Sequence, residues 1–310
     1  MRVSNHEAQL TPMDAFSPSD RHALIHRLSD GRKLGYAEFG DPDGAPVIAL
    51  HGTPGSRLMF ALADQAARER NLRLIALDRP GYGLSDVKDF PTLHDASEDI
   101  AGLADFLQLK QLALIGVSGG GPFAVAFAAS RPDRITLLAL VSPVGPIAEA
   151  SEHIKISTWH RHLFAELALS PLACGSFFWG LKALLAVAPD VAYAGLKHHA
   201  SETDRELLGE GAVRASLYEA IREGLHPGVD GAVQDLQLYC RPWGLALDKI
   251  DVPSLIWQGS DDPIVPPEAA YYLARTLPNC RLEMLPGLGH YWVFGQFGMV
   301  LDAVKAGLRE

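Results

Sequence analysis

The sequence lacks several features that mark particular classes of protein. Its 310 residues include three cysteines, Cys174, Cys240 and Cys280, which lie far apart and without the C-x-x-C spacing of redox or metal sites. We therefore expect buried thiols, with no disulfide framework, no metal centre and no cofactor. The formal net charge is −10, and no run of five basic residues offsets it. This balance argues against nucleic acid and anionic membranes as partners.

Long uninterrupted apolar runs are also absent. The most apolar stretch, residues 163–196, is broken by Pro171, by glycines and by Lys182, well short of the roughly 18 uncharged residues that span a bilayer. Residues 1–16 contain charged side chains and have no apolar centre, so we expect no secretory signal. These features predict a cytoplasmic protein without a membrane span.

Apolar runs alternate with amphipathic stretches along most of the chain, which is 48% hydrophobic and therefore able to bury a sizeable core. An antiparallel hairpin is expected around Asp30 and Gly31, within residues 22–39. After it, strand-like runs alternate with helix-like stretches, the runs at residues 47–50, 72–77, 112–115 and 135–141, the stretches at 57–70, 93–107 and 122–130. This alternation predicts the α/β class, with a mostly parallel sheet and helices on both faces.

The alternation stops at residues 142–146 and resumes at residues 252–257. The segment between them is rich in helix formers and leaves the sheet beyond a strand end, which predicts a helical cap over the site. We therefore divide the chain into a loosely ordered extension (1–20), a core (21–145 and 249–310) and a cap (146–248).

A serine lies in a glycine turn at residues 116–120, which read G-V-S-G-G. An apolar run precedes this turn and a helix-like stretch follows it. A sharp strand-to-helix elbow strains the backbone of Ser118 and requires residues without bulk beside it, here Gly116 and Gly120. The pattern predicts a nucleophilic serine held above the sheet.

A candidate acid and a candidate base follow later strands, so the three residue types appear along the chain in the order Ser, Asp, His. Asp261 and Asp262 follow the apolar run at residues 253–257, and His290 follows the run at 281–285. A serine hydroxyl needs a base to take its proton, and a histidine can both accept and return it. A carboxylate behind the imidazole fixes its tautomer, and either aspartate meets this requirement.

These residues and four further motifs resemble the α/β-hydrolase family over about residues 21–308. The motifs are H-G-T-P-G (51–55), D-R-P-G-Y-G-L-S (78–85), G-S-D-D-P-I-V-P (259–266) and G-L-G-H (287–290). The resemblance implies an eight-stranded, mostly parallel sheet flanked by helices, with an inserted helical cap. It also selects Asp262, three positions after Gly259, as the acid, and leaves Asp261 as a solvated or turn-capping side chain.

The resemblance also implies an oxyanion hole. One donor is the backbone N–H of Gly119, after the nucleophile. The other is that of Thr53, because Pro54 has no N–H. His51 is expected to hold the shape of its loop.

Other residues near the expected site have less specific roles. Arg79 and Tyr82 lie in a glycine-rich and proline-containing stretch that is typical of a rigid turn. Within the cap, residues 228–235 mix glycine and acid, and Tyr239 and Trp243 are candidates for the substrate pocket.

The leading function is a serine hydrolase that cleaves carboxylic esters, or related lactones and thioesters, through an acyl-enzyme. The apolar cap implies a small-molecule substrate of apolar character. One alternative is an aminopeptidase of the proline iminopeptidase type. That branch usually has two glycines after the histidine and a bulky tryptophan beside the nucleophile, whereas this chain has Gly52-Thr53 and Val117-Ser118-Gly119. A ligand receptor that hydrolyses slowly is the other alternative. Monomer and homodimer both remain open.

Overall fold

A computed structural model of the chain describes residues 20–89, 92–149 and 170–308. The N-terminal extension expected over residues 1–20 therefore lies outside the described residues, apart from its last position. Residues 150–169, within the expected cap, also lie outside them.

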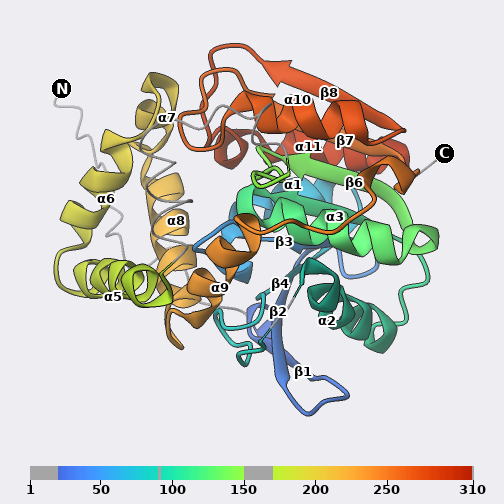
Figure 1. Cartoon of the computed structure of the whole chain (residues 1–310), viewed down its shortest axis with the longest axis horizontal. Coiled ribbons are helices and arrows are strands. Elements are labelled where there is room, and N and C mark those ends of the chain that lie inside the picture. Colours follow the sequence, from blue (N-terminus) through green and yellow to red (C-terminus); the bar gives the residue numbers. More distant parts are fainter. Residues whose placement is uncertain (1–19, 90–91, 150–169, 309–310) are drawn as a thin grey trace, which may run out of the picture.

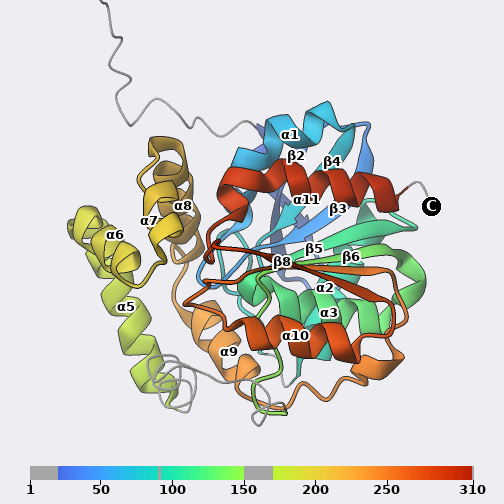
Figure 2. The same ribbon diagram turned by 90° about the horizontal axis from the view of Figure 1, so that it is seen from above.

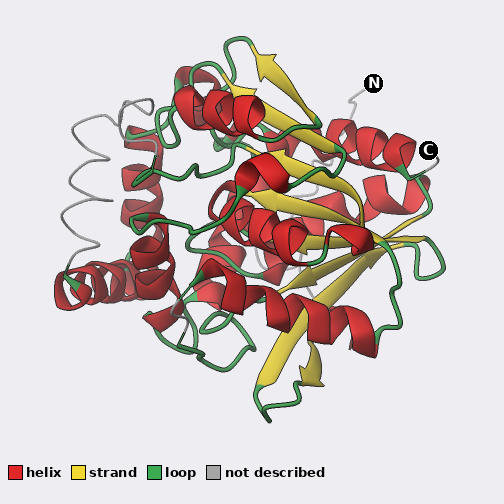
Figure 3. Ribbon diagram, turned by 45° about the vertical axis from the view of Figure 1, so that its right-hand side comes forward, coloured by secondary structure: helices red, strands yellow, loops and turns green. Residues whose placement is uncertain are grey.

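The core is one eight-stranded sheet in the order β1-β2-β4-β3-β5-β6-β7-β8. Its strands are β1 (Leu24–Arg27), β2 (Lys33–Gly40), β3 (Ala45–Leu50), β4 (Leu72–Leu77), β5 (Leu112–Val117), β6 (Ile135–Val141), β7 (Ser254–Gly259) and β8 (Cys280–Leu285). Strand β2 runs antiparallel to β1 and β4, and the remaining pairs are parallel. Figure 3 shows the strands as one continuous twisted sheet. The predicted hairpin and mostly parallel sheet are confirmed.

Helices cover both faces of the sheet, as Figure 2 shows. On one face lie α2 (Leu93–Phe106), α3 (Gly121–Ser130) and α10 (Pro267–Thr276), whose buried side chains share a cluster with one set of strand residues. On the other lie α1 (Asp64–Glu69) and α11 (Val293–Gly307), which share a second cluster. Because both faces are covered, the central strands β3 and β5 are apolar throughout, and β5 is buried at every position.

The helix predicted over residues 57–70 is only partly correct. Its first half is a 3-10 helix, η2 (Arg57–Ala63), and only its second half is the α-helix α1. The Ser56 hydroxyl caps η2 by accepting the backbone N–H of Leu58 at 3.3 Å, and five of its seven residues are buried.

Between β6 and β7 lie the cap helices, most of which lie together at one end of the molecule (Figure 1). They are α5 (Pro171–Val187), α6 (Pro189–His198), α7 (Glu202–Leu207), α8 (Gly211–Gly224) and α9 (Asp230–Tyr239), and the 3-10 helix η6 (Leu247–Lys249) follows them. Some of their apolar side chains form a third cluster with Tyr82, whereas others, such as Val213 and Leu217 of α8, belong to the cluster that holds α1 and α11. Among the helices that the structure describes, none is long and apolar enough to cross a membrane.

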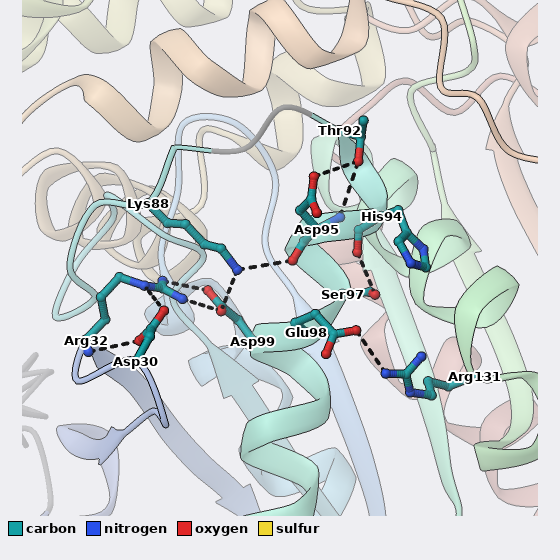
Figure 4. Close-up of polar contacts among 10 residues, drawn as sticks. All are labelled: Asp30, Arg32, Lys88, Thr92, His94, Asp95, Ser97, Glu98, Asp99 and Arg131. Atoms are coloured by element: carbon teal, nitrogen blue, oxygen red, sulfur yellow. Dashed lines mark hydrogen bonds and ion pairs between the residues drawn. The ribbon is translucent and has the colours of Figure 1, made fainter.

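Charged side chains join α2 to the hairpin at the edge of the sheet (Figure 4). The buried carboxylate of Asp99 accepts hydrogen bonds from Arg32 at 2.5 and 2.8 Å and from Lys88 at 3.2 Å. Glu98 on the same helix pairs with Arg131, which follows α3, at 2.9 Å. These contacts connect the β1–β2 hairpin, α2 and the end of α3.

Candidate active site

Ser118 lies in a tight turn between β5 and α3, and its backbone has a φ of +51°. Such a conformation costs a residue other than glycine about 1–3 kcal/mol, which the surrounding packing must offset. A Cβ added at Gly116 would lie 2.9 Å from the Cβ of Ala124, and one added at Gly120 would lie 2.4 Å from the carbonyl oxygen of Leu50. The turn therefore requires both glycines, for the steric reason that the sequence predicted.

The structure brings Ser118, His290 and Asp262 together from loops that follow β5, β8 and β7. The His290 Nε2 atom lies 3.0 Å from the Ser118 hydroxyl, and its Nδ1 atom lies 2.7 Å from Asp262 Oδ2. The other oxygen of Asp262 accepts the backbone N–H groups of Ile264 and Val265, both at 2.8 Å. These two bonds fix the carboxylate toward the ring, so Nδ1 carries the hydrogen and Nε2 faces the serine.

Asp261, the other candidate acid, points elsewhere. Its carboxylate is exposed and accepts a hydrogen bond from the Ser260 hydroxyl at 2.7 Å. That hydroxyl also accepts the backbone N–H of Gly287 at 2.8 Å. Asp261 therefore belongs to the turn between the two loops, and Asp262 is the aspartate that contacts His290.

His290 is 8% exposed, and two opposing effects act on its charge. Burial disfavours the imidazolium, but the negative charge and hydrogen bond of Asp262, with a further contribution from Asp204, raise the pKa of His290 above its usual value. The imidazole therefore holds a proton more readily than its burial alone would allow.

The loop after β3, residues 51–56, lies beside the elbow; we call it the oxyanion loop. A Cβ added at Gly52 would lie 3.3 Å from the Cβ of Ser118, and one added at Gly119 would lie 2.5 Å from Thr53 Oγ1. Thr53 and Gly119, predicted from distant parts of the sequence, are therefore neighbours. Their backbone N–H groups belong to the two segments that flank the serine.

His51 shapes the oxyanion loop from inside. Its Nε2 atom accepts the backbone N–H of Arg79 at 3.2 Å, and its Nδ1 atom donates to the carbonyl oxygen of Gly52 at 2.7 Å. Burial, and then the charge of Arg79, lower the pKa of His51 well below its usual value. The ring is therefore neutral, and its contacts agree with the expected role in holding the loop.

Comparison with known proteins identifies the family of this chain. Residues 45–295 match the family model of the alpha/beta hydrolase fold. The chain belongs to this family. A non-heme chloroperoxidase of Streptomyces lividans is 29% identical over 84% of this chain and 91% of its own length. A 2-hydroxy-6-oxononadienedioate/2-hydroxy-6-oxononatrienedioate hydrolase of Pseudomonas putida is 27% identical over 88% of this chain and 90% of its own length.

Among solved structures, an esterase from Exiguobacterium antarcticum superposes with a TM-score of 0.71 and covers 93% of this chain and all of its own. Its sequence identity is 19%, so the likeness concerns the fold. The predicted family and fold are confirmed, and the chain has the architecture of an α/β hydrolase.

In this α/β hydrolase, Asp235 of cap helix α9 reaches the oxyanion loop. Its Oδ2 atom accepts hydrogen bonds from Thr53 Oγ1 at 2.6 Å, from the Tyr82 hydroxyl at 2.6 Å and from Arg79 at 2.5 Å. Arg79 also donates to the carbonyl oxygen of His51. Arg79 and Tyr82, predicted as parts of a rigid turn, thus also connect the cap to the oxyanion loop.

Tyr239, at the end of the same helix, contacts both oxyanion segments. Its hydroxyl donates to the carbonyl oxygen of Gly119 at 2.7 Å and lies 2.7 Å from Thr53 Oγ1. Burial, and then the neighbouring Asp235, raise the pKa of this phenol well above its usual value, so it stays a neutral donor. Trp243, the other predicted pocket aromatic, packs with Tyr239 in the core cluster that holds α2, α3 and α10.

Two further buried side chains, absent from the predicted site, support the acid and histidine loops of this α/β hydrolase. Gln258, the penultimate residue of β7, donates to Asp262 Oδ2 at 2.9 Å. Asp204 of α7 accepts the backbone N–H groups of His290 and Tyr291 at 2.6 and 2.9 Å. The only sequence signal for Asp204 is the S-x-x-D pattern of residues 201–204, which indicates a helix start and gives no sign of a contact with a catalytic loop.

Proposed function

We propose that this α/β hydrolase is a serine hydrolase that cleaves carboxylic esters, or related lactones and thioesters, through an acyl-enzyme. The observation that carries the proposal is the continuous chain of hydrogen bonds from Ser118 through His290 to Asp262, with distances of 3.0 and 2.7 Å. A serine at the end of such a chain can lose its proton to the imidazole as it attacks a carbonyl carbon.

In the proposed reaction, Ser118 attacks the ester carbonyl and His290 takes the hydroxyl proton, while Asp262 holds the imidazolium. The carbonyl oxygen then carries negative charge, and the backbone N–H groups of Thr53 and Gly119 bind it; such a contribution typically reaches several kcal/mol. His290 returns the proton to the leaving alcohol. A water molecule, activated by the same histidine, then hydrolyses the acyl-enzyme.

The cap supports a small-molecule substrate of apolar character, because its residues are mainly apolar and its helix α9 reaches the oxyanion loop. A cytoplasmic location is part of the proposal. The three cysteines, Cys174, Cys240 and Cys280, favour it, because their odd number and wide separation do not suit the disulfide framework of a secreted protein.

The proline iminopeptidase alternative is disfavoured by the space beside the nucleophile. A Cβ added at Gly119 would lie 2.3 Å from the Tyr239 hydroxyl, so Tyr239 fills the place where a side chain at that position would begin. A bulky residue there would require α9 to move.

Carbon–carbon bond hydrolysis is a second candidate, and the relative from Pseudomonas putida, which aligns over most of this chain, is named as a hydrolase of a carbon-rich dienedioate, 2-hydroxy-6-oxononadienedioate. Assaying 2-hydroxy-6-oxononadienedioate beside simple esters separates the two reactions. Faster turnover of the dienedioate would replace the ester proposal.

The test of the ester proposal is hydrolysis of a chain-length series of p-nitrophenyl esters, combined with labelling by a fluorophosphonate. We expect wild-type protein to label at Ser118 with multiple turnovers, and Ser118→Ala to lower kcat by roughly 10^4-fold or more. Ser142→Ala is the matched control, because Ser142 also follows a strand and also has a positive φ, of +44°. The control should still label and turn over.

Two other results would contradict the proposal. Labelling at Ser118 with a single turnover would favour the slow receptor, whereas equal turnover by wild type and Ser118→Ala would remove Ser118 from the reaction.

A further inference from the structure

The loop that carries His290 is held by a short cap helix. This histidine loop comprises residues 286–292. The Thr203 hydroxyl donates to the carbonyl oxygen of Gly287 at 3.0 Å, and the Asp204 carboxylate accepts the N–H groups of His290 and Tyr291 at 2.6 and 2.9 Å. Helix α7 therefore contacts the loop at three backbone groups, and one of them belongs to His290 itself.

Asp204 occupies a position where its side chain would ordinarily serve its own helix. Ser201 caps α7 and its hydroxyl accepts the Asp204 N–H at 3.1 Å. In the usual capping box the acid returns to the backbone of the capping serine. Here the carboxylate turns to the histidine loop instead, and the residue is 1% exposed.

The histidine loop has space for this carboxylate and for little else. A Cβ added at Gly289 would lie 2.0 Å from Asp204 Oδ2 and 2.1 Å from the Ser201 hydroxyl. A side chain at residue 289 would thus displace the aspartate. The fit of Asp204 against Gly289 is a second observation, independent of the hydrogen bonds, that ties the cap to His290.

We propose that Asp204 is a positioning residue for His290: from the cap, it holds the backbone of the histidine in place and adds a second negative charge near the imidazole. This inference rests on the proposed serine hydrolase function and extends it, because it makes the cap a part of the proton-transfer machinery.

The charged groups that act on His290 are Asp262, in contact with its ring, and Asp204, in contact with its backbone. The uncharged neighbours are the Ser118 hydroxyl and the ring of Tyr291, whose centroid lies 5.4 Å from that of the imidazole. Both carboxylates raise the pKa of His290, against the effect of burial. Removing the charge of Asp204 should therefore lower that pKa, so that the ring loses its proton at lower pH.

The experiment measures the pKa of His290 by NMR in protein with labelled histidine, together with the pH dependence of kcat/KM on a p-nitrophenyl ester. The variants are Asp204→Asn and the matched control Glu202→Gln, which removes one charge from an exposed position of the same helix. A His290→Gln variant assigns the signal. If Asp204→Asn does not fold, Asp204→Ser removes the same charge and keeps one acceptor.

We expect Asp204→Asn to lower the His290 pKa by roughly 0.5–1 unit. The acid limb of kcat/KM should move by the same amount, and kcat should fall about tenfold, because Asn has one acceptor oxygen for two N–H groups. Glu202→Gln should leave all three unchanged. An unshifted pKa in Asp204→Asn, or an equal shift in Glu202→Gln, would overturn the proposal.

The NMR measurement requires no turnover. Absence of labelling and turnover in wild-type protein would therefore reject the proposed function, while the pKa shift would still decide whether Asp204 acts on His290.

Discussion

The histidine loop and the oxyanion loop are both connected to the cap by a buried aspartate, but different groups balance the negative charges of the two aspartates. Asp235 pairs with Arg79 at 2.5 Å, and their side chains are 2% and 3% exposed, so its charge is balanced by a cation. Asp204 accepts two backbone N–H groups, and the nearby group that can become positive is His290.

A cap can therefore influence a reaction in two ways. A charge balanced by a guanidinium holds geometry and has little effect on neighbouring protons. A charge balanced by dipoles alone acts on the nearest titratable group. We therefore expect Asp235 to control the shape and stability of the oxyanion loop, and Asp204 to influence the proton affinity of His290.

The largest loss of activity is expected when the carboxylate that contacts the His290 ring is removed. Asp262→Asn should lower kcat by about 10^4-fold with little loss of stability, because an amide at this position favours the wrong imidazole tautomer. Asp261→Asn is the matched control, one residue away and exposed, and should retain near wild-type kcat. Steady-state kinetics on a p-nitrophenyl ester measure both. Equal losses in the two variants would mean that the acid loop, rather than the carboxylate at residue 262, is responsible.

On the oxyanion side, Asp235→Asn should lower the free energy of unfolding by about 3–5 kcal/mol, because Arg79 would remain buried without its counter-ion. Urea denaturation measures this loss. The control is Asp190→Asn, which removes a cap aspartate whose ion pair with Arg214 is exposed, and it should cost at most ~1 kcal/mol. A similar small loss in both variants would show that the buried pair does not stabilise the connection between cap and loop.

A smaller effect is expected from removing a hydroxyl group, which leaves every charge in place. Tyr239→Phe removes the hydroxyl that contacts Gly119 and Thr53. We expect kcat to fall roughly tenfold, because the oxyanion segments lose that contact. The free energy of unfolding should fall by about 1 kcal/mol.

Tyr193→Phe is the control for that change, because the Tyr193 hydroxyl in the cap also donates to a buried carbonyl, that of Leu208, at 2.8 Å. It should show a similar stability loss with unchanged kcat. If both variants keep wild-type kcat, Tyr239 serves packing only.

Much of the core could be predicted, because its signals are local. Strand β5 is a continuous apolar run since both faces of the sheet are covered, and the turn at Ser118 needs glycines at fixed positions. His290 and the pair Asp261 and Asp262 were found because each follows a strand in the same sheet, and the family resemblance then selected Asp262. The 3-10 helix η2 was missed, since its apolar run at residues 58–63 does not distinguish a 3-10 helix from an α-helix.

The support of the site from the cap could not be predicted. Asp204 lies 86 positions before His290 in the chain, and Asp235 lies 182 positions after Thr53, so no local pattern connects them. Asp204 is part of a pattern that indicates a helix start, and Asp235 lies in a stretch that mixes glycine and acid. Neither pattern shows which way the carboxylate turns.

The sequence by itself determined the order of strands and helices, the glycine turn and the residue types that follow the strands. Apolar periodicity and the steric demands of glycine act over a few residues, which is why they can be read along the chain. Which cap side chains reach the two loops depends on the tertiary structure alone. Those choices depend on how the cap helices pack on the sheet, where the cost of burying each carboxylate is met by donors from distant segments.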